Sequence, residues 1–182
     1  FRRYADFFES AADGMIVIDR SGQILFANPR AREIIGYTET ELTALRITDL
    51  VTNVDRDRGD RMLRGFSDGI YPRGVDLTIS DKGGAPIIIN VSFSSVLHED
   101  DAVLCTFRDV TLERQTAVEL KQTKEFLERV IDSSVDGIVS ANLKGTVLLF
   151  NRAAARIFGY SPSDVVGKMR LERLYPQGVA RD

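Results

Sequence analysis

The sequence is poor in the residues that form covalent cross-links and metal sites. It contains one cysteine, Cys105, one histidine, His98, and no tryptophan among its 182 residues. A single cysteine excludes an intramolecular disulfide and any cysteine-rich zinc or iron–sulfur site. A single histidine excludes most of the histidine clusters that bind metal ions. We therefore expect no metal site in this chain.

Neither a strong charge of one sign nor a long apolar run is present. Lys and Arg number 24 and Asp and Glu number 27, which gives a formal net charge of −3. This balance leaves no basic surface for nucleic acid or for an anionic membrane. The sequence also has no signal peptide and no apolar run of the ~18 residues that a membrane-spanning helix needs. We expect a cytoplasmic segment that contacts neither nucleic acid nor membrane.

An internal repeat organises the sequence. Residues 8–37 and 131–160 align without a gap at an offset of 123, and ten of these thirty positions are identical. The identical pairs include Asp13/Asp136, Gly14/Gly137, Asn28/Asn151 and Gly36/Gly159. A period of this length is that of a domain rather than of a solenoid unit. The chain is therefore expected to contain one complete copy of a domain and the beginning of a second.

The repeat and the local patterns predict four segments. These are an N-terminal helix over 1–12, a complete domain over 13–111, a linker over 112–130 and the N-terminal part of a second domain over 131–182. Because the second copy is truncated and the first residue is Phe1 rather than Met, we expect a piece of a longer protein. A membrane anchor can lie in the other parts of that protein.

Turn residues and apolar alternation predict an α+β fold. Two short apolar strands flank Gly22, and short helices follow, one of which begins after Asn28 and ends at Gly36. Three further strands alternate apolar and polar residues between 75 and 110. This order predicts a five-stranded antiparallel sheet with the helices on one face.

The segment between the two copies predicts a long helix. Residues 112–130 contain neither Gly nor Pro, and a heptad frame places Leu120 and Leu127 on one seam with polar residues between them. This pattern predicts a coiled-coil-like linker that pairs weakly, as in a parallel dimer.

No motif in the chain carries catalytic chemistry. His98 lies in a polar turn and not on the helix that a phosphoacceptor histidine needs, and no Gly-rich nucleotide loop is present. Residues 53–57 imitate the start of a calcium loop, but Arg58 and Arg64 stand where that loop needs Gly and Glu. The chain is not expected to be an enzyme.

The inner side chains of the predicted sheet and of its covering helices are almost all apolar. They either close as a dry core or leave a cavity for a small, largely apolar ligand. The candidate pocket residues are Ile34, Ile35, Leu50, Met62, Phe66, Leu77, Ile79, Ile89, Val91, Phe93 and Cys105.

An ordered set of motifs resembles the PAS domain family. The set consists of the Asp13-Gly14 start, the hairpin at Gly22, the helix from Asn28 to Gly36-Tyr37, the Lys82-Gly83-Gly84 turn and the closing Arg108-Asp109-Val110-Thr111. The last segment is similar to the Asp-Ile-Thr ending of bacterial PAS domains, with Val in place of Ile. The resemblance covers residues 8–111 and, as a truncated copy, 131–182. It implies a bacterial signalling protein, most often a two-component sensor histidine kinase.

The resemblance also bears on cofactors. Some PAS domains bind haem through a histidine on a middle helix, and residues 55–66 contain none. The light-sensing branch binds flavin through a cysteine that follows an asparagine, and here Asn53 is followed by Val54. No cofactor is therefore predicted, and haem and covalent flavin are disfavoured. A flavin-bearing redox or light sensor stays open as an alternative, as do a diguanylate cyclase, a phosphodiesterase or a transcription factor as the output.

The resemblance and the linker together predict a sensory and dimerisation module. It would relay a signal through the linker to an output domain of the same polypeptide. The relay candidates are Asp109 and Thr111, which can cap the linker or pair with a base, and Leu120 and Leu127 on its seam. The dimer-contact candidates are Tyr4, Phe7 and Phe8, next to an outer sheet face expected to be apolar.

Overall fold

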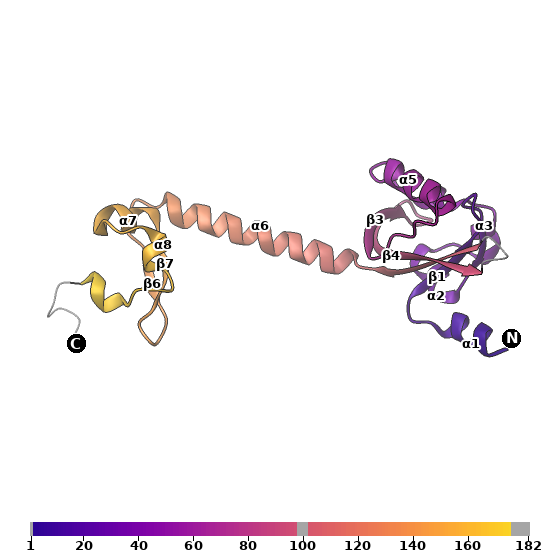
Figure 1. The fold of residues 1–182 in the computed structure, drawn as a ribbon. Coiled ribbons are helices and arrows are strands. Elements are labelled where there is room, and N and C mark those ends of the chain that lie inside the picture. Colours follow the sequence, from indigo (N-terminus) through magenta and orange to yellow (C-terminus); the bar gives the residue numbers. More distant parts are fainter. Residues whose placement is uncertain (1, 98–101, 176–182) are drawn as a thin grey trace. The chain divides into compact units, whose positions relative to one another are not determined.

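The computed structural model describes residues 2–97 and 102–175, with side chains for 6–95 and 102–175. The chain forms two compact units, Phe1–Thr116 and Ala117–Asp182, which are taken here one at a time (Figure 1). His98 and the turn around it, and the side chain of Tyr4, lie outside the described residues.

The first unit is built on a five-stranded antiparallel sheet. Its strands are β1 (Gly14–Ile18), β2 (Ile24–Ala27), β3 (Val75–Ser80), β4 (Pro86–Leu97) and β5 (Ala102–Asp109), in the spatial order β2-β1-β5-β4-β3. The register places Ile16 opposite Cys105, and Cys105 opposite Phe93. Inward-facing residues of three strands thus form one row, and the predicted α+β fold is confirmed.

Five helices precede or connect the strands. They are α1 (Arg2–Ser10), α2 (Pro29–Ile35), α3 (Glu39–Thr43), α4 (Ile47–Leu50) and α5 (Arg56–Ser67). The side chain of Asn28 caps α2, and Gly36 ends it with a φ of 80°, a conformation that glycine adopts without strain. Thr38 and Glu41 form a capping box at α3.

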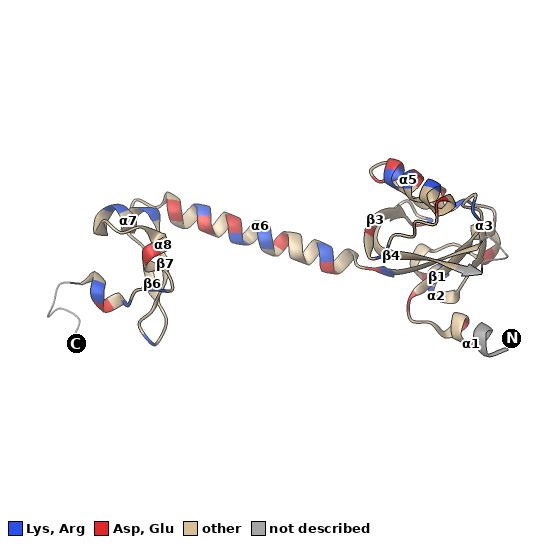
Figure 2. Ribbon diagram, viewed as in Figure 1, with Lys and Arg blue, Asp and Glu red and all other residues tan. Residues whose placement is uncertain are grey.

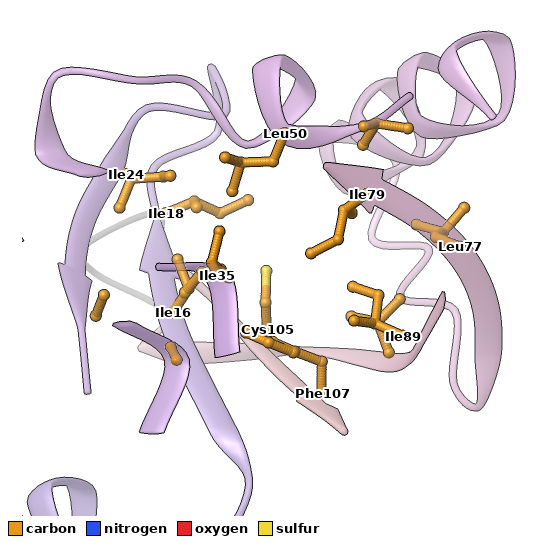
Figure 3. Packing of buried hydrophobic residues seen from close by; sticks show 14 of the residues in the cluster. Ile16, Ile18, Ile24, Ile35, Leu50, Leu77, Ile79, Ile89, Cys105 and Phe107 are labelled. Carbon is orange, nitrogen blue, oxygen red and sulfur yellow. The ribbon is translucent and has the colours of Figure 1, made fainter. Parts of the chain in front are cut away.

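The core of the first unit lies between the inner face of the sheet and the short helices α2–α4. Figure 3 shows Ile16 and Cys105 from the sheet pointing towards Ile35 and Leu50 from the helices. Burial of each such aliphatic side chain contributes about 1.5–3 kcal/mol relative to exposure in water. Period-two alternation along β1, β3 and β5 therefore holds these helices on one face of the sheet.

The outer face of the sheet carries both polar and apolar side chains. On β5, Leu104 is followed on the same face by Thr106 and Arg108, and Ser92 and Asn90 lie opposite these two residues on β4. Apolar side chains on this face include Val17 and Leu104 near β1 and Ile88 on β4, where Ile88 pairs with Thr78 of β3.

A long helix, α6 (Thr111–Ser133), begins in the first unit and ends in the second. None of its described residues is buried, and acidic and basic residues are interspersed along it (Figure 2). Ion pairs of Lys121 with Glu125 and of Lys124 with Glu128, each spaced by four residues, support the helix by about 0.3–0.5 kcal/mol each.

The second unit repeats the beginning of the first. It contains β6 (Val139–Ala141), β7 (Val147–Phe150), α7 (Arg152–Phe158), α8 (Pro162–Val165) and a 3-10 helix (Leu171–Leu174). Asn151 caps α7 and Gly159 ends it, as Asn28 and Gly36 do for α2. Its described strands form a two-stranded sheet only, which leaves Phe158 36% exposed where the equivalent Ile35 is 1% exposed. The four-segment division stays a prediction.

Candidate functional site

A small apolar cavity lies between the inner face of the sheet and helices α2 and α4. Its volume is about 30 Å³, well below the ~150 Å³ of apolar cavities that bind benzene. Eight of the eleven predicted pocket residues line it: Ile35, Leu50, Leu77, Ile79, Ile89, Val91, Phe93 and Cys105. No charged or hydroxyl-bearing side chain lines it, so it suits an apolar group and offers no chemistry for catalysis.

A second cavity of the same volume, about 30 Å³, lies between α4, α5 and the sheet. Met62 and Phe66, two further predicted residues, line this one. Ile34 lines neither of these two cavities and packs against the core instead. The residues shared by the two linings form the wall between them, and these are Ile47, Val51, Leu77 and Phe93.

Four residues of the first lining were missed by the sequence reasoning: Ile16, Ile47, Val51 and Phe107. Two of them carried a usable signal, because Ile16 alternates inward on β1 and Phe107 lies two residues after Cys105 on β5. Val51 carried none, since it is held in place by an isolated bridge to Ile79, a residue 28 positions away.

The buried polar atom of this region is the thiol of Cys105. Burial raises the pKa of this thiol far above its ordinary value, so it stays neutral at physiological pH. It acts as a small apolar filler in the cavity wall. Within the described ranges 2–97 and 102–175, no group of three His, Cys, Asp or Glu residues is placed to hold a metal ion.

The start of α6 is fixed to strand β4 of the cavity-bearing sheet. Asp109 Oδ1 accepts a hydrogen bond of 2.9 Å from the N–H of Thr111. Thr111 Oγ1 in turn accepts one of 2.9 Å from the N–H of Ile88 on β4, and the N–H of Val110 donates to the Ile88 carbonyl at 2.9 Å. These bonds place both predicted relay residues at the root of α6. Within the described residues Asp109 caps the helix and pairs with no base.

A further contact, missed by the sequence reasoning, joins α6 to the outer face of the sheet. Arg114 Nε on α6 donates to Asp76 Oδ2 at 2.7 Å, and Asn90 Nδ2 donates to Asp76 Oδ1 at 2.6 Å. The bond from Asn90, and then the one from Arg114, lower the pKa of Asp76 below its ordinary value of 3.8. Asp76 is therefore ionised and ties β3, β4 and α6 together at neutral pH.

We predict that this tie is lost only in acid. The folded-state pKa of Asp76 lies below the ordinary value, so the stabilisation is complete above about pH 4 and disappears as the pH falls through the lowered pKa. Replacing Arg114 with Gln should raise that pKa towards 3.8, because one of the two bonds to the carboxylate is weakened. NMR titration of the Asp76 carboxyl carbon measures it, with Arg129→Gln on α6 as control. An unchanged Asp76 titration in Arg114→Gln would contradict the assignment.

The remaining predicted residues lie apart from both cavities. Phe7 on α1 is 68% exposed and Phe8 is half-buried. Leu120 and Leu127 on α6 are 70% and 52% exposed. No helix in the described part of the chain has the length and apolar character needed to cross a membrane.

Comparison with known proteins places the chain among sensory proteins. The family model described as "PAS fold" matches residues 2–110 and again residues 125–178. The sensor histidine kinase TmoS of Ectopseudomonas mendocina is 26% identical over 175 residues, which is 90% of this chain and 18% of that protein. Sporulation kinase E of Bacillus subtilis is 20% identical over 155 residues, 85% of this chain and 21% of the kinase. The chain thus spans about a fifth of the length of these relatives.

Solved structures resemble the first unit. A domain of a sensory box sensor histidine kinase/response regulator from Geobacter sulfurreducens matches with 29% identity and a TM-score of 0.54, covering 59% of this chain and 92% of that one. A domain of an HTR-like protein from Haloarcula marismortui matches with 25% identity and a TM-score of 0.52, covering 59% of this chain and 89% of that one.

Proposed function

The chain belongs to the PAS family, and from that premise we propose that it senses a signal, dimerises and relays the signal through α6 to an output domain of the same polypeptide. The output domain we propose is a histidine kinase of a bacterial two-component system. The two kinases among the relatives support this choice over a diguanylate cyclase, a phosphodiesterase or a transcription factor. The chain itself is a sensory module, and the catalysis belongs to the output domain.

The observation that carries this proposal is the root of α6. Thr111 is hydrogen-bonded to Ile88 on β4, and Ile89, the next residue of that strand, lines the first cavity. A change in the width of the cavity therefore moves the strand to which α6 is bonded. Since protein cores are close-packed, such displacements pass to neighbouring elements instead of being absorbed locally.

The signal we propose is a small apolar molecule that occupies the space between the sheet and the helices. Two cavities of about 30 Å³ each, separated by a wall of aliphatic side chains and one phenylalanine, support this chemistry. Because each is far smaller than the ~150 Å³ of cavities that bind benzene, a ligand must displace the wall, and displacement of the wall is what would couple binding to a change in the sheet. A resident cofactor is not part of the proposal.

The dimer we propose forms through α6, with α1 as a further contact. Leu120, Leu127 and Val130 are about half exposed or more, and they lie along one side of a helix that the first unit does not cover. A second copy of the chain covers such a seam by parallel pairing, and the threonines within it keep the pairing weak. Phe7 adds an exposed aromatic side chain on α1. The proposed location is the cytoplasm, where the kinase substrate ATP is found.

The test is the replacement of Asp109 with Ala in the complete protein. Loss of the cap at the root of α6 costs about 1 kcal/mol, which corresponds to about a fivefold shift between two output states. We expect kinase autophosphorylation to change by that factor while the thermal unfolding of the sheet stays within a few degrees. Gln115→Ala, in the next turn of α6, is the matched control. Equal activity in the wild type and both variants would contradict the proposed relay.

A further inference from the structure

One buried asparagine gathers the backbone groups at the beginning of the first unit. The side chain of Asn28 is fully buried, and its Nδ2 donates to the carbonyl oxygens of Phe8 and Asp13, each at 3.1 Å. Its Oδ1 accepts from the N–H groups of Met15 and Ala31, each at 2.8 Å. The C-terminal part of α1, the first strand and the first turn of α2 therefore meet at one side chain.

The second unit repeats this arrangement with α6 in the position of α1. Asn151 Nδ2 donates to the carbonyl oxygens of Ile131 and Asp136 at 3.0 and 2.9 Å. Its Oδ1 accepts from the N–H groups of Ile138 and Ala154 at 2.8 and 2.9 Å. Every bond has its counterpart at the repeat offset of 123 residues. The end of α6 is thus the incoming helix of the second unit, as α1 is the incoming helix of the first.

Asp13 connects the incoming helix of the first unit with its outgoing helix. Its carbonyl is held by Asn28, and its carboxylate accepts two bonds, of 2.9 and 3.2 Å, from Nε and Nη2 of Arg108. This pairing raises the pKa of the Arg108 guanidinium. Arg108 is on β5, and the chain between it and Thr111 at the start of α6 contains only Asp109 and Val110.

The connection runs along the outer face of the sheet. Asp13, Arg108 and Arg114 border a groove of about 310 Å³ on that face, together with the polar side chains of Asn90, Ser92 and Thr106. None of Asn28, Asp13 and Arg108 lines either apolar cavity of the inner face.

We propose that Asn28, Asp13 and Arg108 form a polar connection that transmits a displacement of α1 to the root of α6 without passing through the cavity. The inference rests on the proposed relay function and deepens it. The first unit then responds to two inputs, a ligand in its core and the position of the helix that enters it. Because α6 is the incoming helix of the second unit, a displacement of α6 would act on Asn151 and Asp136 as a displacement of α1 acts on Asn28 and Asp13.

Hydrogen exchange of the full chain tests this connection. Asp6→Pro interrupts α1 in its middle, far from α6 in sequence. We expect the amides of residues 112–116 to exchange about two- to fivefold faster in this variant, the range set by one solvent-exposed ion pair. In an Asp13→Asn background, which keeps the Asp13 carbonyl but lacks the carboxylate, these amides should exchange faster from the start. In that background Asp6→Pro should not accelerate the exchange of these amides any further.

Two further variants separate coupling from general loosening. Lys82→Gln removes another exposed ion pair, that of Lys82 with Glu41, and should leave the effect of Asp6→Pro intact. The double variant Asp13→Arg with Arg108→Asp swaps the two charges and rebuilds the ion pair. In that background Asp6→Pro should again accelerate hydrogen exchange at residues 112–116. The connection is refuted if Asp6→Pro leaves residues 112–116 unchanged in the wild type, or if its effect persists in Asp13→Asn. These experiments measure no output activity, so such a result would not contradict the proposed sensory function. The Asp109→Ala comparison tests that function separately.

Discussion

Replacing Asn28 with alanine is expected to lower the free energy of unfolding of the first unit by about 3–5 kcal/mol. The side chain is fully buried and makes four hydrogen bonds to backbone groups from three elements. Alanine leaves these buried donors and acceptors without partners, and each unsatisfied buried group costs about 1–3 kcal/mol before the structure relaxes. Partial entry of water into the vacated space keeps the total below the sum of four such penalties.

Denaturant titration of the full chain, followed by NMR amide signals from each unit, measures this loss. Asn151→Ala should lower the stability of the second unit by a comparable amount and leave that of the first unchanged, because the two asparagines serve equivalent bonds. Asn53→Ala, at an exposed position, should change the stability of the first unit by less than about 0.5 kcal/mol. If Asn28→Ala lowers the free energy of unfolding of the first unit by less than about 1 kcal/mol, the four hydrogen bonds do not make the expected contribution to its stability.

The second large effect is expected from Phe93→Ala. Phe93 forms part of the wall between the two cavities, is 6% exposed and packs against Phe66 in a tilted arrangement with the ring centroids 5.0 Å apart. Removal of the ring should cost about 3–5 kcal/mol and join the two cavities into one. The joined space approaches the ~150 Å³ of apolar cavities that stay dry and bind benzene.

Stabilisation by benzene distinguishes a residue that separates the two cavities from one that only stabilises the fold. At ten times its dissociation constant it should stabilise Phe93→Ala by about 1.4 kcal/mol and leave the wild type unaffected. The matched control is Phe126→Ala, which removes the same ring from an exposed site on α6 and should change the first unit by less than about 0.5 kcal/mol. Stabilisation of the wild type by benzene to the same extent would show that the wall does not separate the cavities.

The fold was predictable because its signals are local. Asn28 and Gly36 bound α2 through contacts with residues three or four positions away, and period-two alternation sets the inner face of each strand. The same holds for the root of α6, since Asp109 caps Thr111 only two residues further on. The internal repeat then predicts the same local elements for residues 131–160 as for residues 8–37.

The parts that could not be predicted depend on residues far apart in the sequence. Arg114 and Asp76 are 38 positions apart, and Arg108 and Asp13 are 95 apart, so no local pattern pairs them. The cap of Asn28 could be predicted from the helix that follows it, but its two bonds to Phe8 and Asp13 reach back 20 and 15 positions. Likewise, the wall of the cavities needs Val51, which is bridged to Ile79 on the sheet, 28 positions further along the chain.

The bond from each buried asparagine to its incoming helix has a consequence for how such proteins are assembled from modules. Asn28 and Asn151 bind main-chain carbonyls, and the residues that supply them, Phe8 and Ile131, are both half-buried and apolar but differ in shape. The asparagine itself therefore recognises only a carbonyl at the right distance before the first strand, and the helix that supplies it can differ in side chains, with an apolar residue at this position in both copies. Gene duplication and recombination can join this domain to many different helices and preserve the same connection.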